Sequence, residues 1–281
     1  MLTAGDIQFQ PHSSKIWRFS NSILVMVSAD DISVQNMIFQ DVYKVVNDRI
    51  KAEPNNWWKV KDVAELYSDH YCKLKLTCIK KEILGPFALN NETFISRQKE
   101  MSEEFIGEMV GRIRKYSIPH ISTILAGCDE NGAHLYVIND EDISCHDSVG
   151  FVAIGAGAGH AESHFMLSGY HPGLHESKAL LTVHQAKKKA EVAPGVGKET
   201  DMFIIGPRLG IHFIFPGDLI DSLDKFYKEY KNKIDTIDKK NQDKIDEFIK
   251  RYAKERAEDI NKQNIEKPKE TKKEEIKSPD N

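Results

Sequence analysis

The sequence lacks the usual marks of membrane, secreted and nucleic-acid-binding proteins. No apolar run approaches the roughly 20 residues that span a bilayer, and the N-terminal residues show no basic and then apolar signal peptide. Only four of the 281 residues are cysteines, and none has C-x-x-C spacing, which argues against a disulfide framework or a zinc knuckle. The net charge of -4 offers no basic field for nucleic acid. These absences predict a cytoplasmic protein with neither membrane nor nucleic-acid partners.

Charge divides the chain into two parts. Residues 225–281 hold 17 Lys and Arg against 14 Asp and Glu, which leaves 22 basic and 29 acidic residues before them. We therefore expect an acidic domain over residues 1–222 and a charged tail over 223–281. Apolar residues at spacings near 3.5 predict an amphipathic helix at the start of the tail: Leu223, Phe226, Tyr230, Ile234, Ile237, Ile245, Phe248 and Tyr252.

Two interpretations of that helix remain open. Its apolar side is either a surface for a partner or, as we favour, the side by which a solvated helix packs on its own domain. After Ile260 the sequence has almost nothing to bury, so we expect disorder there.

The domain alternates between strand and helix patterns. Expected strands are Lys15–Phe19, Ile23–Ser28, His120–Cys128, Ala133–Asn139, Ser148–Ile154, Met202–Gly206 and Gly210–Phe215. The third and fourth are joined by an Asn-Gly turn. Expected helices are Ile32–Ile50, Val60–Ile83, Ser96–Tyr116, one from His160, and Glu176–Val192. Antiparallel hairpins with helices long enough to cover both faces predict an α+β layered sandwich with its sheets inside.

Two motifs are only weak evidence for a nucleotide-binding site or a metal site. Gly155-x-Gly157 starts like a dinucleotide-binding fingerprint, but His160 occupies the third glycine position, and no phosphate-binding G-K-[ST] occurs. Four histidines have i, i+4 spacing and could share a metal, although no carboxylate or cysteine completes a ligand set and we favour structural or surface roles: His160, His164, His171 and His175.

An ordered series of short motifs resembles the proteasome β-subunit family of N-terminal-nucleophile (Ntn) hydrolases, especially its small bacterial relatives. The series covers residues 1–215 and consists of T-A-G at Thr3–Gly5, Lys15 opening a strand, the turn Ser28–Asp30, LAG-x-D at Leu125–Asp129, AIG-x-G at Ala153–Gly157 and VGKETD at Val196–Asp201. The resemblance implies a four-layer αββα sandwich, threonine-type peptide or amide hydrolysis, no cofactor, homo-oligomeric rings or stacks, and for some relatives an unfoldase ATPase partner.

The resemblance also implies roles for particular residues. In this family the free α-amino group of an N-terminal Thr, Ser or Cys is the general base for its own side chain. Lys15 matches the lysine that lowers the pKa of that amine, and the Ala29 N–H matches the oxyanion donor. Asp201 matches the acid that orients the amine. Thr3 and Gly155-Ala156-Gly157 match substrate-lining backbone.

The nucleophile itself is missing from this sequence. In the family it opens a strand hairpin that precedes T-A-G, whereas this chain begins at Met1, so the chain as written should be inactive. Removing two strands from a buried sheet would leave backbone groups unpaired, which favours a shortened version of a longer protein. The alternatives are a non-catalytic subunit with a binding or structural role and the histidine-based metal-binding protein.

Overall fold

A computed structural model describes residues 2–4, 7–9, 14–206 and 208–265. The chain divides into two compact units, Met1–Leu223 and Asp224–Asn281. The first unit has a mixed α+β fold, which confirms the expected class, and the second is helical. None of the described helices is both long and apolar enough to cross a membrane.

A five-stranded antiparallel sheet forms the centre of the first unit. Its strands follow one another in chain order: β3 (Ile16–Ser20), β4 (Ile23–Ala29), β5 (Ile121–Asp129), β6 (Gly132–Asn139) and β7 (Asp142–Cys145). The Asn131-Gly132 turn joins β5 to β6 as expected, with Gly132 at a φ of 125° that favours glycine. Two separate hairpins accompany this sheet, β1 (Leu2–Ala4) with β2 (Ile7–Phe9), and β8 (Phe203–Ile205) with β9 (His212–Ile214).

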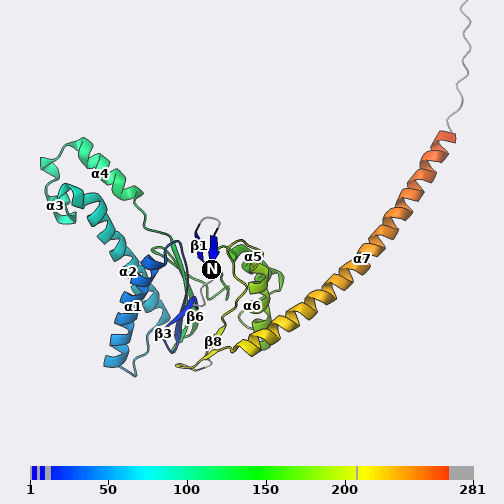
Figure 1. The fold of residues 1–281 in the computed structure, drawn as a ribbon, viewed down its shortest axis with the longest axis horizontal. Coiled ribbons are helices and arrows are strands. Elements are labelled where there is room, and N and C mark those ends of the chain that lie inside the picture. Colours follow the sequence, from blue (N-terminus) through cyan, green and yellow to red (C-terminus); the bar gives the residue numbers. More distant parts are fainter. Residues whose placement is uncertain (1, 5–6, 10–13, 207, 266–281) are drawn as a thin grey trace, which may run out of the picture. The chain divides into compact units, whose positions relative to one another are not determined.

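Helices α1 (Ile32–Ala52) and α2 (Val60–Ile79) cover one face of the five-stranded sheet, as Figure 1 shows. Side chains alternate between the faces of a strand, and the odd-numbered residues of β4 and β5 point into this apolar core. Val25 and Leu125 are fully buried there against Val42 of α1 and Tyr67 of α2. The even-numbered residues face the other way, towards α5 (Ala158–Leu167), which packs against α6 (Glu176–Ala190).

A helical arm extends α2 and has a small core of its own, built on Ile79, Leu84, Phe94 and Met109. The expected Val60–Ile83 helix ends as an α-helix at Ile79 and continues as a π-helix over Lys80–Leu84 and a 3-10 turn over Gly85–Phe87. The expected Ser96–Tyr116 helix is wrong: the segment contains the end of α3 (Asn91–Ser96), a 3-10 turn over Gln98–Glu100 and α4 (Glu103–Lys115).

Helix caps explain why that segment breaks. Asn90 and Thr93 form a reciprocal capping box at the start of α3. The Ser102 side chain accepts a hydrogen bond from the Phe105 N–H, which starts α4 as a new helix.

The strand expected over Ser148–Ile154 is wrong, and the fifth strand is instead β7, which the sequence analysis did not predict. A turn closes at Gly150, which has a φ of 78°, and the Ala153 N–H donates to Glu162 Oε1 of α5 rather than to a neighbouring strand. Phe151 stacks on Phe165 and meets Tyr170 edge-on. The apolar residues of this segment thus pack on α5 and not on a sheet.

The tail forms a single helix, α7, over Gly217–Ile265. It starts six residues earlier than expected and continues past Ile260, so the expected disorder is wrong for Asn261–Ile265. The rest of the expected disordered segment, residues 266–281, lies outside the described residues.

Candidate active site

A cavity of about 540 Å³ opens on the face of the five-stranded sheet that α1 and α2 leave uncovered. It lies where β4 ends, β5 begins and β6 ends, and the segment 152–156 with the first turn of α5 closes it on the other side. Ser28 and Asp30 line it on either side of Ala29, the candidate oxyanion donor, and Gly155 and Ala156 line the opposite wall. The structure therefore brings two of the predicted site segments together.

Close backbone packing fixes the Gly155–Gly157 wall. Gly155 has a φ of 85°, and a Cβ there would lie 3.1 Å from Ser28 Oγ. Gly157 caps α5, and a Cβ there would lie 2.8 Å from the Ala190 Cβ of α6. Two glycines thus hold this wall against β4 and α6, and a larger residue at either position would displace it.

The strand register determines where the Ala29 N–H points. Hydrogen-bonded and non-bonded pairs alternate along antiparallel strands. Asp30 N donates to His120 O at 3.0 Å and Cys128 N donates to Ser22 O at 2.9 Å, which makes the even-numbered residues of β4 the ones that bond to β5. The N–H and C=O of Ala29, opposite Ile121, therefore point towards the β3 side.

Lys15 lies at that same end of the sheet. Ile16 pairs with Met26, so the position before it, Lys15, lies alongside Val27, two residues from Ala29. Its side chain is exposed, and it precedes β3 rather than opening it as expected. Lys15 does not line the cavity. Opposite Val27, its side chain starts on the face of the sheet that α1 and α2 cover, although its backbone lies next to the strand end that borders the cavity.

The structure does not bring the other predicted catalytic residue to this cavity. Asp201 is exposed in the segment before β8 and is absent from the cavity lining as far as the described residues define it. The β8–β9 hairpin contacts the sheet near the opposite end of β4, where Gly210 N donates to Ser22 Oγ at 2.7 Å. Thr3 lies in β1, opposite Gln8 of β2.

The cavity carries polar groups that the sequence analysis did not single out. Ser122 Oγ donates to Asn139 Oδ1 at 2.6 Å, and His120 Nδ1 lies 3.0 Å from Asp140 Oδ1. No clear signal in the sequence marks Ser122 and Asn139, because polar and apolar residues do not alternate along β5 and β6: the cavity face also carries Ile124 and Val137. Glu162 could not be found from these strands either, since it comes from α5.

These side chains do not form a nucleophile–base–acid chain of their own. Among the described residues, the Ser144 Oγ–His146 Nε2 contact of 3.2 Å has no carboxylate on the histidine, because Asp147 contacts His134 instead. The Asp140 carboxylate of the His120–Asp140 pair accepts a hydrogen bond from the Tyr71 hydroxyl, but burial and the nearby Asp140 raise the pKa of this phenol, which disfavours the nucleophilic phenolate. The cavity therefore offers a polar, backbone-lined space without an activated nucleophile in the described part of the chain.

A charged cluster holds the far end of the β5–β6 hairpin to α2. His134 lies 2.7 Å from Asp147 and 3.1 Å from Asp129, and Asp129 also accepts from the first N–H of α2, that of Val60, at 3.0 Å. Burial works against the charged forms of all three groups, but their hydrogen bonds and opposite charges outweigh it. Asp147 and Asp129 raise the pKa of His134. The N–H groups of Val60 and Asn131, followed by His134, lower the pKa of Asp129, and His134 with the Leu135 N–H lowers that of Asp147. This cluster fastens the fold and lies away from the cavity.

The four spaced histidines do not assemble into a metal site. His164 Nε2 lies 3.2 Å from Gln185 Oε1, while His171 and His175 use Nδ1 to accept from the N–H groups of Gly173 and Ser177. His160 is exposed. In the described ranges no group of three or more His, Cys, Asp and Glu side chains is placed to hold a metal ion.

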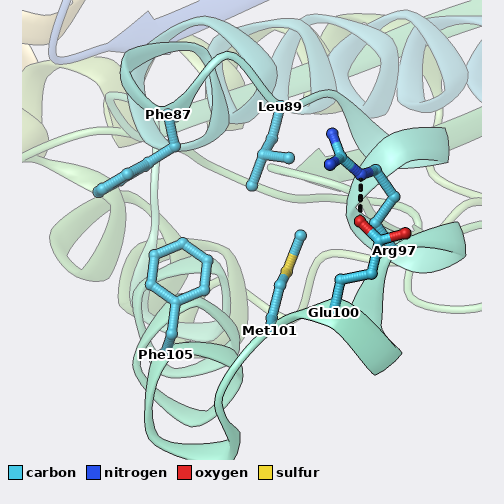
Figure 2. Close-up of a pocket in the computed structure, with 6 residues that line it drawn as sticks. All are labelled: Phe87, Leu89, Arg97, Glu100, Met101 and Phe105. Carbon is cyan, nitrogen blue, oxygen red and sulfur yellow. Dashed lines mark hydrogen bonds and ion pairs between the residues drawn. The ribbon is translucent and has the colours of Figure 1, made fainter.

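A second cavity, of about 290 Å³, lies in the helical arm and is lined by four apolar side chains and one ion pair. Figure 2 shows Phe87, Leu89, Met101 and Phe105 facing one another across it, with the Arg97–Glu100 ion pair of 2.8 Å at its edge. The rings of Phe87 and Phe105 meet edge-on. It carries no group with nucleophilic or acid–base chemistry beyond that ion pair, which makes the cavity beside Ala29 the better candidate site.

Sequence comparison with known protein families finds no match, and comparison with curated proteins finds none.

Proposed function

We propose that residues 1–222 form a proteasome β-subunit-like Ntn hydrolase domain whose site is the cavity beside Ala29, acting on peptide bonds or other amides. The observation that carries the proposal is the register at the end of β4. It directs the Ala29 N–H towards the β3 side, where Lys15 lies, and the close approach of Gly155 to Ser28 borders the cavity at the same strand end. A backbone donor beside a lysine is the arrangement that an oxyanion site in this family requires.

The proposed architecture is a four-layer αββα sandwich. Helices α1 and α2 would form the first layer and the five-stranded sheet the second, with the β1–β2 and β8–β9 hairpins belonging to an incomplete third layer and α5 and α6 to the fourth. The cavity between the sheet and α5 supports this order, because it lies where a more complete second sheet would pack.

Each matched residue has a proposed role. Lys15 lowers the pKa of a neighbouring α-amine by like-charge repulsion, so that the amine accepts the proton of the nucleophile. The Ala29 N–H binds the oxyanion, and the backbone at Thr3 and Gly155–Gly157 pairs with an extended substrate. The resemblance assigns Asp201 to orienting the amine, although Asp201 does not line the cavity in this structure. The nucleophile would be a Thr, Ser or Cys at the mature N-terminus, which the resemblance places on a strand hairpin ahead of T-A-G.

The first test is the intact mass and N-terminal sequence of the protein purified from its native cells. A mature chain that extends upstream and begins with Thr, Ser or Cys is expected. A folded mature chain that begins at Met1 contradicts the hydrolase and favours the alternative, a non-catalytic proteasome-like subunit with a binding or structural role.

The second test measures turnover of fluorogenic peptides by that native-length protein. Lys15→Ala is expected to lower kcat by roughly 100-fold or more, an effect of the size seen for oxyanion and acid–base groups. Lys51→Ala, which removes an exposed lysine at the end of α1, is the matched control and leaves turnover unchanged. Equal activity of the two variants contradicts the role of Lys15.

Assembly is the last part of the proposal. A cytoplasmic ring or stack of identical subunits, with an unfoldase ATPase delivering substrate, follows from the resemblance alone. The metal-binding alternative is not favoured by the histidine contacts described above.

A further inference from the structure

The long helix α7 carries an 11-residue repeat that the 3.5-residue spacing of the sequence analysis concealed. Three consecutive copies cover Leu223–Lys233, Ile234–Lys244 and Ile245–Glu255. Their first positions are Leu223, Ile234 and Ile245, their fourth positions Phe226, Ile237 and Phe248, and their eighth positions Tyr230, Asn241 and Tyr252. Eight of these nine positions are apolar or aromatic.

The 11-residue period determines how the apolar stripe runs along the surface of α7. Eleven residues complete three turns, or about 3.67 residues per turn, close to the 3.6 of a straight α-helix. The three positions therefore stay on one side of α7 over 30 residues, about 45 Å of helix. A repeat of 11 is the pattern of helices that wind around each other with a slight right-handed twist.

The stripe is exposed from Phe226 onwards except at the half-buried Ile234, whereas Leu223, its first position, is buried. Phe226, Ile237 and Phe248 each leave more than half of their surface exposed, at 58%, 55% and 57%. A continuous apolar stripe of this length is larger than the isolated apolar residues that any protein surface carries. It is therefore a surface for association.

The opposite side of α7 stabilises the helix without help from the stripe. Each repeat has Asp at its second position and Lys at its sixth: Asp224 with Lys228, Asp235 with Lys239, and Asp246 with Lys250. An acid four residues before a base is the favourable order for an ion pair within a helix. Because these ion pairs stabilise the helix by themselves, the helix does not depend on the apolar stripe for its stability.

We propose that α7 pairs with the same helix of a second copy of this chain, parallel and in register, as a two-stranded coiled coil. The proposal is independent of the function proposed for the cavity.

Asn241 selects the parallel register. In a parallel, in-register pair it meets Asn241 of the second copy, and two amides satisfy each other inside an otherwise apolar seam. In an antiparallel pair centred on the stripe it would lie opposite Ile234 and lose that partner.

Flanking charges favour the same arrangement. Lys233 and Asp238 border the stripe on opposite sides and are five residues apart, the offset at which flanking residues of parallel helices meet. In the antiparallel alternative Lys233 would approach Lys244 of the second copy, a contact between like charges.

The test measures the mass of the full chain in solution by light scattering across a dilution series. The wild type is expected to associate, and Ile237→Asp is expected to raise the dissociation constant by roughly 100-fold or more, because it places a charge in the seam of both helices. Thr236→Asp is the matched control: it adds the same side chain one residue away, outside the stripe, and leaves the mass unchanged. Circular dichroism checks that both variants keep their helix.

A monomeric wild type overturns the proposal. So does an oligomer whose mass is the same in Ile237→Asp, since its contacts then lie elsewhere, for example in the first unit.

Disulfide trapping tests the orientation, in a Cys145→Ser background that removes the one native cysteine classed as exposed. Asn241→Cys is expected to form a covalent dimer under mild oxidation, whereas Thr236→Cys does not. A covalent dimer that forms only on mixing Ile234→Cys with Asn241→Cys overturns the parallel register.

Discussion

The two faces of the five-stranded sheet differ although the same strands build both. Towards α1 and α2, β5 presents residues such as Thr123 and Leu125, both fully buried. Towards α5 it presents Ser122 beside a cavity of about 540 Å³. The helix-covered face thus contributes a close-packed core, and the other face contributes both packed residues, such as Ile124 and Val137, and the wall of the cavity. Substitutions on adjacent residues of one strand can separate these two contributions.

Truncating a side chain on the helix-covered face should have the largest effect. Val25→Ala removes two carbons from a fully buried position and leaves a void, which should lower the free energy of unfolding by about 2.5 kcal/mol. Val137→Ala makes the same change at a residue that is also buried but borders the cavity, where part of its surroundings is already open space, and should cost about 1 kcal/mol.

Urea denaturation followed by tryptophan fluorescence measures both variants, because Trp17, Trp57 and Trp58 all belong to the first unit. Equal losses for the two variants would mean that the faces are packed alike.

The glycine wall gives the next largest effect. Gly155→Ala forces alanine to a φ of 85° and brings its Cβ to 3.1 Å from Ser28 Oγ, so it should lower the free energy of unfolding by about 2 kcal/mol. Gly159→Ala is the control within α5, where a Cβ meets nothing within 4 Å, and it should stabilise the helix by about 0.8 kcal/mol. A Gly155→Ala protein as stable as the wild type would contradict the close approach of this wall to β4.

Sequence reasoning succeeded where a local pattern decides the structure and failed where contacts between distant segments decide it. The periodic apolar residues of α1 and the Asn131-Gly132 turn were enough to predict a helix and a hairpin. The Ser148–Ile154 strand failed because Phe151 finds its partners, Phe165 and Tyr170, on α5 and in the loop after it.

The candidate site also combines a feature that a local pattern predicts with one that depends on contacts between distant segments. Gly155 could be named from its motif, but its contact with Ser28 depends on how α5 meets the sheet, and no spacing reveals that. The 11-residue repeat of α7 is the opposite case. The repeat was present in the sequence, where the stripe positions follow one another at intervals of 3, 4 and 4 residues. Describing these intervals by an average of 3.5 concealed the 11-residue period.

Ion pairs on the two faces should differ in strength and in pH dependence. His134, on the helix-covered face, has a side chain only 20% exposed, and His134→Gln should lower the free energy of unfolding by about 1.5 kcal/mol at pH 5.5. His120→Gln is the control beside the cavity, where the histidine side chain is 54% exposed, and it should cost less than about 0.5 kcal/mol.

The sign of the pH dependence follows from the pKa shifts. The pKa of His134 is raised above 6.5, so its contribution is complete below pH 6.5 and is lost as the pH rises through the raised value. The pKa values of Asp129 and Asp147 lie below 3.8, so their contribution is complete above pH 3.8 and is lost as the pH falls through the lowered values. Thermal unfolding at several pH values should therefore show the largest difference between wild type and His134→Gln from pH 4 to 6.5. A difference that grows above pH 7 would contradict the assignment.

Two adjacent hydroxyls on β5 make the smallest and most direct comparison. Thr123 Oγ1 donates to Tyr67 Oη at 3.2 Å, and both residues are buried under α2. Thr123→Val keeps the shape but removes a partner of a buried phenol, which should lower the free energy of unfolding by about 1 kcal/mol.

Ser122→Ala removes the 2.6 Å hydrogen bond to Asn139, but the amide stays beside the cavity, where water replaces the hydroxyl. Its cost should be only about 0.3 kcal/mol. Since the two residues are neighbours on one strand, both substitutions are made in the same stretch of backbone, and a larger loss for Ser122→Ala would mean that the cavity face, too, is closed to solvent.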